Sequence, residues 1–229
     1  MRDVIDSLEA NPIRGRWNQA KLERAADAVG AAVVQPPAPG LQISAAYGIL
    51  PRLEVGLRTS VNALRGWARW QFLKVRPGVY GSVGVGVTGY LYGFPVQNFT
   101  SRVEVHEYQR IDYDMPLLFG YSGRYLHVWG GPKVVLSTFD AGFRACTHRV
   151  DGTCREQSEV SLDGTAAYLG GQLGFAVGYR RFWVGFELTI VRLGTEADLA
   201  LSSGDEVAEA RFEHSGMVLQ PAIGVISWF

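Results

Sequence analysis

Hydrophobic side chains alternate with small or polar ones from residue 30 almost to the end of the chain. Three segments show this alternation most clearly, 79–92, 111–121 and 167–179. In each of them one face carries bulky aliphatic and aromatic side chains, and the other carries mostly glycine, alanine or polar residues. A period of two is the geometry of a β-strand, whose successive side chains point to opposite faces. The pattern therefore predicts an all-β fold.

The small size of the second face separates two β architectures. A soluble β-sandwich needs bulky residues on its inner face and charged or polar residues on its outer face. Here the bulky face alternates with a face too small to fill a core. This arrangement suits a closed barrel whose outer surface meets lipid and whose narrow interior has little room. We therefore expect a closed antiparallel up-and-down transmembrane β-barrel, with a soluble lipocalin-type barrel as the structural alternative.

The lengths of the connections give an independent indication. Strands are expected at 41–48, 53–61, 64–74, 79–92, 103–121, 124–138, 165–179, 182–193 and 216–229. Short turns fall on one side of this arrangement, and long loops at about 93–102, 139–164 and 194–215 fall on the other. Bacterial membrane barrels have this asymmetry, with short periplasmic turns and longer outer loops.

The expected number of strands is ten. Single-chain bacterial barrels have even strand numbers, and residues 30–35 can supply the additional strand before a proline-rich stretch. Eight strands is the alternative, in which 53–74 forms one long strand. That run greatly exceeds the roughly 9–11 residues that a tilted spanning strand needs.

The N-terminal part differs from the rest. Residues 18–29 are rich in good helix formers, so the chain divides into an arm at 1–29, partly helical or flexible, and a barrel at 30–229. The first residues lack the apolar core of a secretory signal. Either a signal was removed before this numbering or the start is truncated, and this is the main argument against export. No apolar run reaches the roughly 20 residues of a transmembrane helix.

Charge and short motifs exclude several function classes. The chain has 22 basic and 22 acidic side chains, which argues against nucleic acid as a partner. Residues 84–89 match a glycine-rich dinucleotide fingerprint, but another strand pattern follows where a helix is needed. The acidic stretch 195–211 lacks the spacing of a calcium loop. We expect no cofactor and no metal.

Aromatic residues gather near the short turns, on the face predicted to meet lipid. Aromatic rings gain at the boundary between lipid tails and headgroups. The residues expected at this membrane interface are Tyr47, Trp70, Phe72, Tyr121, Tyr179 and Phe182.

The last strand, 217–229, alternates apolar positions and ends on Phe229. It resembles the C-terminal signature of outer-membrane β-barrel proteins, although Ser227 departs from the aromatic or apolar residue usual at that position. The resemblance covers 30–229 as an architecture and assigns no subfamily. It implies a location in the bacterial outer membrane, contact with its lipids, an interfacial Phe229, and recognition of the last strand by the barrel-assembly machinery.

The inward face of the predicted barrel collects charges. These are Glu54, Arg58, Arg65, Arg69, Asp112, Asp114, Lys133 and Glu187. In a narrow interior such charges must pair or be hydrated, because an unpaired buried charge is costly. A network that closes the interior indicates a structural, adhesive or surface-interaction role. A polar path would instead indicate a porin-like channel for small solutes.

Two cysteines lie in the loop predicted at 139–164. A disulfide between Cys146 and Cys154 is expected in an oxidising compartment, with two free thiols as the alternative. The sequence does not favour a zinc site, because no C-x-x-C spacing or histidine pair accompanies them.

Catalysis has little support in the sequence. His106 lies beside Glu104 and Glu107, but no serine can be matched to it. His127 is expected to be a hydrogen-bonded interior residue. We therefore do not expect an enzyme, and a lipid-modifying hydrolase or acyltransferase remains the alternative.

Overall fold

The structure is a computed structural model, and it describes residues 41–60, 63–75, 78–90, 103–150, 153–203 and 206–228. Nine strands lie in this part of the chain. They are β1 (Leu41–Leu50), β2 (Leu53–Thr59), β3 (Ala63–Val75), β4 (Val79–Tyr90), β5 (Val103–Ser122), β6 (Leu126–Val150), β7 (Thr153–Tyr179), β8 (Phe182–Ser203) and β9 (Glu206–Trp228). The expected all-β class is confirmed for these residues.

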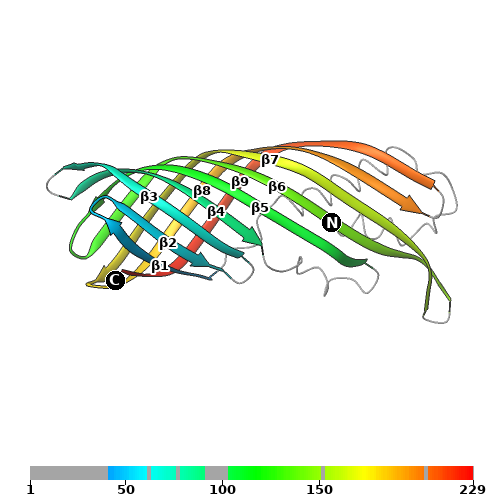
Figure 1. Cartoon of the computed structure of the whole chain (residues 1–229), viewed down its shortest axis with the longest axis horizontal. Helices are drawn as coiled ribbons and strands as arrows, with labels where there is room; N and C mark the ends of the chain where they lie inside the picture. The colour runs from blue at the N-terminus through cyan, green and yellow to red at the C-terminus, as the bar shows by residue number, and fades with distance from the viewer. Residues whose placement is uncertain are drawn as a thin grey trace.

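The strands form one sheet that closes into a ring, in the order β1 to β9 (Figure 1). Neighbours in the sequence pair antiparallel, as in β7 and β8, where Tyr179 faces Phe182 across a tight turn. The ring closes where β1 pairs with β9 in parallel, with Leu41 facing Ile223. This one parallel junction allows an odd number of described strands to form a closed sheet.

The strand count differs from the ten expected. The additional strand predicted at 30–35, like the arm at 1–29, lies outside the described residues. The eight-stranded alternative is wrong, because 53–74 contains two strands. β2 ends at Thr59, and β3 begins at Ala63 and pairs antiparallel with β2.

Two predicted loops are also wrong. Residues 139–150 and 153–164 belong to β6 and β7, which pair up to Val150 and Thr153. Residues 194–203 and 206–215 belong to β8 and β9, which pair up to Ser203 and Glu206. The alternation continues in both segments, but the outward residues become polar, so the sequence of each segment resembles that of a loop. The loop predicted at about 93–102 lies outside the described residues.

The wall of the ring is consequently uneven (Figure 1). β1 to β3 are 10, 7 and 13 residues long, whereas β6 to β9 have 25, 27, 22 and 23 residues. β6 to β9 extend far past β1 to β3 at the end opposite the short turns. We call this part of β6 to β9 the extension.

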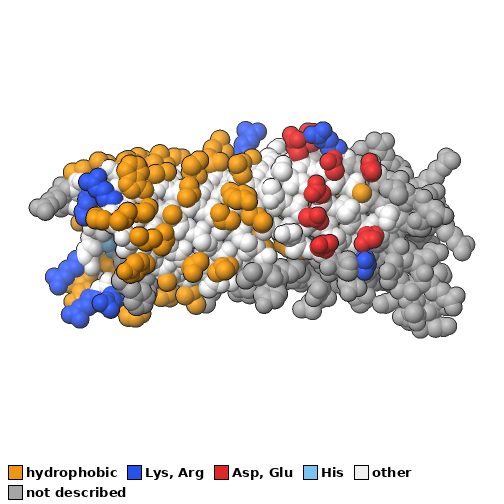
Figure 2. All heavy atoms as spheres, in the orientation of Figure 1, with side chains coloured by type: hydrophobic (Ala, Val, Ile, Leu, Met, Phe, Trp, Pro, Cys, Tyr) orange, Lys and Arg blue, Asp and Glu red, His pale blue; other side chains and the backbone are white. Residues whose placement is uncertain are grey.

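Large hydrophobic side chains cover the outer face near the short turns. In Figure 2 they occupy the half of the visible face toward the turns, and a group of Asp and Glu side chains follows farther along. Leu169, Leu173 and Phe182 are 66%, 61% and 70% exposed. We call this zone the apolar belt. Among the described residues there is no helix with the length and apolar character needed to cross a membrane.

Candidate functional site in the interior of the ring

The interior accommodates large aromatic rings because glycines lie directly opposite them. Gly56 pairs with Trp67, and Gly174 pairs with Trp129. A Cβ added at Gly56 would lie 2.3 Å from the Trp67 ring, and one at Gly174 would lie 2.4 Å from the Trp129 ring. The small inward face noted in the sequence is therefore the space into which these indoles fold.

Acids and bases of the interior lie in pairs contributed by different strands. Arg69 of β3 pairs with Glu54 of β2. The Arg65 Nε donates to the Asp114 Oδ1 at 2.8 Å, which joins β3 to β5. All four side chains are less than one-third exposed.

A third pair spans a longer interval of the chain. Arg58 Nη1 lies 3.7 Å from Glu187 Oε1. Glu187 also accepts a hydrogen bond from Trp129 and interacts electrostatically with Lys133. The eight charged residues expected inside therefore all lie there, and all but Lys133 belong to an ion pair in the described structure.

The most buried part of this network was missed by the sequence analysis. Arg110 is 3% exposed, and its Nε donates to Asp112 Oδ1 at 2.8 Å. Its guanidinium also donates to Tyr168 Oη at 3.0 Å. Ser137 Oγ donates to Asp112 Oδ1 at 2.6 Å, and Tyr90 Oη donates to Asp112 Oδ2 at 2.9 Å. These contacts join four strands, β4 to β7. Arg110 lies two residues before Asp112 on β5 and so points to the same face. It could have been found by extending the alternation by two residues.

Beyond this network the interior becomes apolar. Phe139, Leu162 and Leu199 are 3%, 0% and 1% exposed, and they belong to one hydrophobic cluster inside the extension. Side chains packed in a core leave few voids larger than a water molecule. Along the axis the interior therefore passes from charged pairs to the Arg110 network and then to a hydrophobic core.

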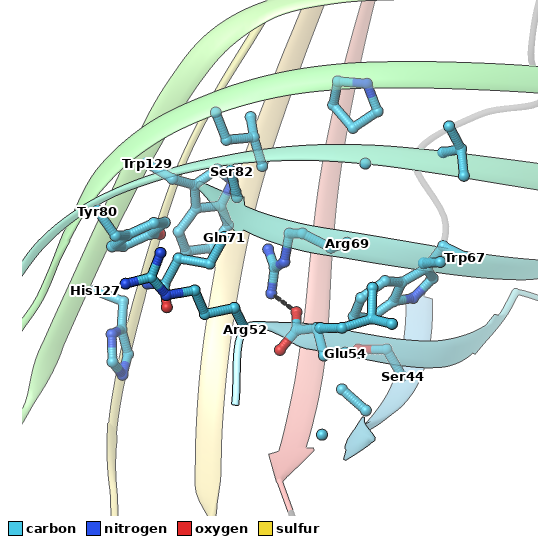
Figure 3. Close-up of a pocket in the computed structure, with 18 of the residues that line it drawn as sticks. Ser44, Arg52, Glu54, Trp67, Arg69, Gln71, Tyr80, Ser82, His127 and Trp129 are labelled. Carbon is cyan, nitrogen blue, oxygen red and sulfur yellow. Dashed lines mark ion pairs between the residues drawn. The ribbon is translucent and has the colours of Figure 1, made fainter. Parts of the chain in front are cut away.

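A cavity of about 390 Å³ lies inside the ring at the short-turn end. Its lining includes the Glu54 and Arg69 pair and the aromatic residues Trp67, Tyr80 and Trp129. Figure 3 shows Tyr80, Gln71 and Arg52 on one side of this cavity and Trp67 with the ion pair on the other. A volume of this size falls in the range of small-molecule sites.

Several polar groups of the cavity are not satisfied by the described residues. Ser82 is 2% exposed, and its Oγ has no hydrogen-bond partner there. The Trp67 Nε1 likewise has none. Arg52, in the turn between β1 and β2, has no ion pair within the described part of the chain. Sequence reasoning could not assemble these residues, because they meet through the register of separate strands.

The aromatic residues predicted at the membrane interface lie on the outer face. Tyr47, Trp70 and Tyr121 are 63%, 51% and 46% exposed. The others within the described residues are Phe72, Tyr179 and Phe182, which are exposed as well. Phe229 lies outside the described residues. Tyr179 stacks on Tyr125 with ring centroids 5.7 Å apart.

Acidic side chains follow the apolar belt on the outer face of the extension. Asp140, Asp163 and Asp198 occupy directly paired positions on β6, β7 and β8. We call these three residues the acidic row. The pKa of Asp140 is raised above its ordinary value, first by desolvation and then by repulsion from Asp163 and Glu107. No group of three or more His, Cys, Asp or Glu residues in the described structure could hold a metal ion.

The expected disulfide is not seen in the described structure. Cys146 faces Gln157 and Cys154 faces Arg149 in the β6 and β7 register. The two cysteines are therefore offset by three positions, about 10 Å along the strands. This exceeds the Cα separation that a disulfide spans. Spacing in the sequence suggested a loop, whereas β6 and β7 pair here as a hairpin whose register shifts between Cys146 and Arg149.

The two histidines considered in the sequence lie on different strands, His106 on β5 and His127 on β6. The His106 side chain lies outside the described part of the structure. His127 is 9% exposed, lines the cavity and lies 3.9 Å from the Trp183 ring, centroid to centroid. His127 is therefore an interior residue in contact with an aromatic ring.

Comparison of the chain with models of protein families, with curated proteins and with solved structures gave no match.

Proposed function

We propose that this protein is a transmembrane β-barrel of the bacterial outer membrane with a closed interior and a non-catalytic structural, adhesive or surface-interaction role. The observation that carries this proposal is the apolar belt. Large aliphatic and aromatic side chains such as Leu169 and Leu173 are more than half exposed on the outer face. A water-soluble surface rarely carries a contiguous apolar area of this kind.

The limits of the belt fit a lipid bilayer. On β7, residues 167–179 carry no charge, and about 9–11 residues of a tilted strand suffice to cross the hydrocarbon. The acidic row lies past one edge of this interval. Exposed basic residues lie past the other edge, at the short-turn end, and they are Arg52, Lys74, Arg124, Arg180 and Arg181. Charges bound the belt at both ends.

The side chains of the interior favour a closed barrel and argue against a channel. The Arg110 network and the hydrophobic cluster containing Leu162 and Leu199 lie in series along the axis. An aqueous path would have to pass both. The extension then presents long strands beyond the membrane, where they are available to outer-surface partners. The lipids of the outer membrane and the barrel-assembly machinery are the further partners of this proposal.

The test is to fold the full chain into detergent and then into lipid vesicles. We expect heat-modifiable migration on a denaturing gel, flotation with the vesicles, and no steady current in a planar bilayer. A chain that stays soluble without detergent and does not float with vesicles contradicts the membrane barrel. A robust open conductance contradicts the closed interior and favours the porin-like channel.

A further inference from the structure

The cavity at the short-turn end combines features that the closed barrel does not use. It is lined by residues from strands far apart in the sequence, from Ser44 on β1 to Glu187 on β8. The Arg110 network lies beyond it, so the cavity ends inside the ring. A pocket with one open end holds a ligand and does not conduct it.

Two buried groups of the cavity and one exposed side chain can bond a ligand. The buried Trp67 indole N–H is a donor, the buried Ser82 hydroxyl can donate or accept, and the exposed Arg52 guanidinium adds five N–H donors. Ser82 and Trp67 have no partner in the described structure. A buried donor without a partner costs free energy that a ligand can recover. The missing group is therefore a hydrogen-bond acceptor.

The charge of the lining indicates an anion. Arg58, Arg65 and Arg69 each have an acidic partner at Glu187, Asp114 and Glu54. Arg52 completes the set of lining arginines and has no such partner in the described part of the chain. One positive charge is thus available at the mouth of the cavity, and guanidinium binds a carboxylate with two parallel hydrogen bonds.

The walls add a preference for a flat apolar group. Trp67, Tyr80 and Trp129 line the cavity from β3, β4 and β6 (Figure 3). Aromatic walls favour an aromatic ring by stacking or edge contacts.

From these observations we infer that the cavity binds a small aromatic carboxylate, with the carboxylate at Arg52 and the ring among Trp67, Tyr80 and Trp129. The proposed function places the open end of the cavity toward the periplasm, so the ligand would enter from that side. Binding itself does not depend on the membrane.

The probe is 4-fluorobenzoate, observed by fluorine NMR with the folded full chain in detergent. The neutral 4-fluorobenzamide has the same size and serves as the matched ligand. We expect saturable binding of the carboxylate with at least about tenfold preference over the amide, since hydrogen bonds to a charged group are stronger than those to a neutral one. Empty micelles measure partition into detergent.

Three variants locate the site. Arg52→Gln should weaken carboxylate binding about tenfold and leave the weak amide binding unchanged. Ser82→Ala removes an unsatisfied hydroxyl, so it should preserve the gel shift and still weaken binding. The matched control is Arg124→Gln, because Arg124 is an exposed arginine in the turn between β5 and β6, at the same end of the ring, and does not line the cavity.

Absence of saturable binding, equal affinity for the two ligands, or an equal loss in Arg124→Gln would each overturn the inference. The binding of an aromatic carboxylate and the proposed function are tested by different outcomes. Carboxylate binding by a chain that does not insert into vesicles would leave the site in place and remove the membrane barrel.

Discussion

The inward glycines of this ring have a shared role that their positions explain. Gly56 and Gly174 lie directly across from Trp67 and Trp129, with no room for a Cβ. Gly120 lies in the same way across from Tyr80. A face of small residues is therefore the complement of a few large rings. The sequence alone showed the small residues but not which ring each of them faces, since that depends on register.

The buried pair of Arg110 and Asp112 leads to a stability prediction. Asp112→Ala leaves the Arg110 guanidinium, 3% exposed, without its carboxylate. Breaking a buried ion pair costs about 3–5 kcal/mol, so the free energy of unfolding should fall by about that amount. The double variant Arg110→Met with Asp112→Leu should recover most of the loss. Urea unfolding of the vesicle-inserted protein measures both, and equal losses in the two variants would contradict the prediction.

The raised pKa of Asp140 leads to a pH prediction. The folded protein binds this proton more readily than the unfolded chain, because desolvation, Asp163 and Glu107 disfavour the carboxylate. The carboxylate therefore lowers stability above the folded pKa, and the penalty disappears as pH falls through that pKa to below the ordinary value. Asp140→Asn should raise the urea midpoint at pH 7 and leave it unchanged at pH 3.

The matched control for Asp140 is Glu196→Gln. Glu196 lies on the same face, 2.9 Å from Arg211 in an ion pair, so its replacement should give no gain at pH 7. A gain of equal size in both variants would show that general charge reduction, and not the acidic row, is responsible.

Individual strands could be predicted from the sequence where the outer face stays bulky and apolar and the inner face stays small or polar. The alternation in 167–179 predicted the exposed face of β7, from Leu169 to Tyr179. It failed to predict the extension, because the outward positions of β6 to β9 become polar past the belt while the inward ones stay apolar. Only the outer face of these strands changes, from apolar to polar, and a search for bulky alternation ends at that boundary.

The belt on β7 leads to a prediction about depth. Leu173 is 61% exposed in the middle of the belt, and Thr165 is exposed on the same face of the same strand near the acidic row. In a bilayer, Leu173→Arg should cost about 2–4 kcal/mol and Thr165→Arg about 0–1 kcal/mol. Folding equilibria in vesicles measure the difference. On a water-exposed surface both substitutions would be tolerated alike, so equal stability would argue against the membrane assignment.

The long strands β6 to β9 give the whole molecule one long side. The sequence did not predict it, because parts of these strands were predicted to be loops. The charged side chains inside the ring could be expected from the alternation of inward and outward positions alone. The cavity could not, because Arg52, Ser82 and Trp67 come together only when the sheet closes. The predicted disulfide is not seen in the described structure, and spacing along the chain could not give the register in which β6 and β7 pair.

The hairpin of β6 and β7 leads to a topological prediction. Cys146 and Cys154 are offset by three positions in the register, and they lie at the end opposite the short turns. In intact cells both should react with a membrane-impermeant maleimide without prior reduction. A Cys146→Ser, Cys154→Ser variant is the labelling control. Labelling that requires a reductant would establish a disulfide, and labelling that requires cell disruption would reverse the proposed orientation.

The parallel junction between β1 and β9 bears on how the ring forms. Every other junction joins neighbours in the sequence, which meet through local hairpins with little loss of chain entropy. β1 and β9 come from opposite ends of the described chain, and only six residue pairs join them, from Leu41 with Ile223 to Ala46 with Trp228. Distant contacts form slowly because a long loop must close first. This junction should therefore be the last to form and the first to open, with faster hydrogen exchange at Ile43 and Val225 than along β7 and β8.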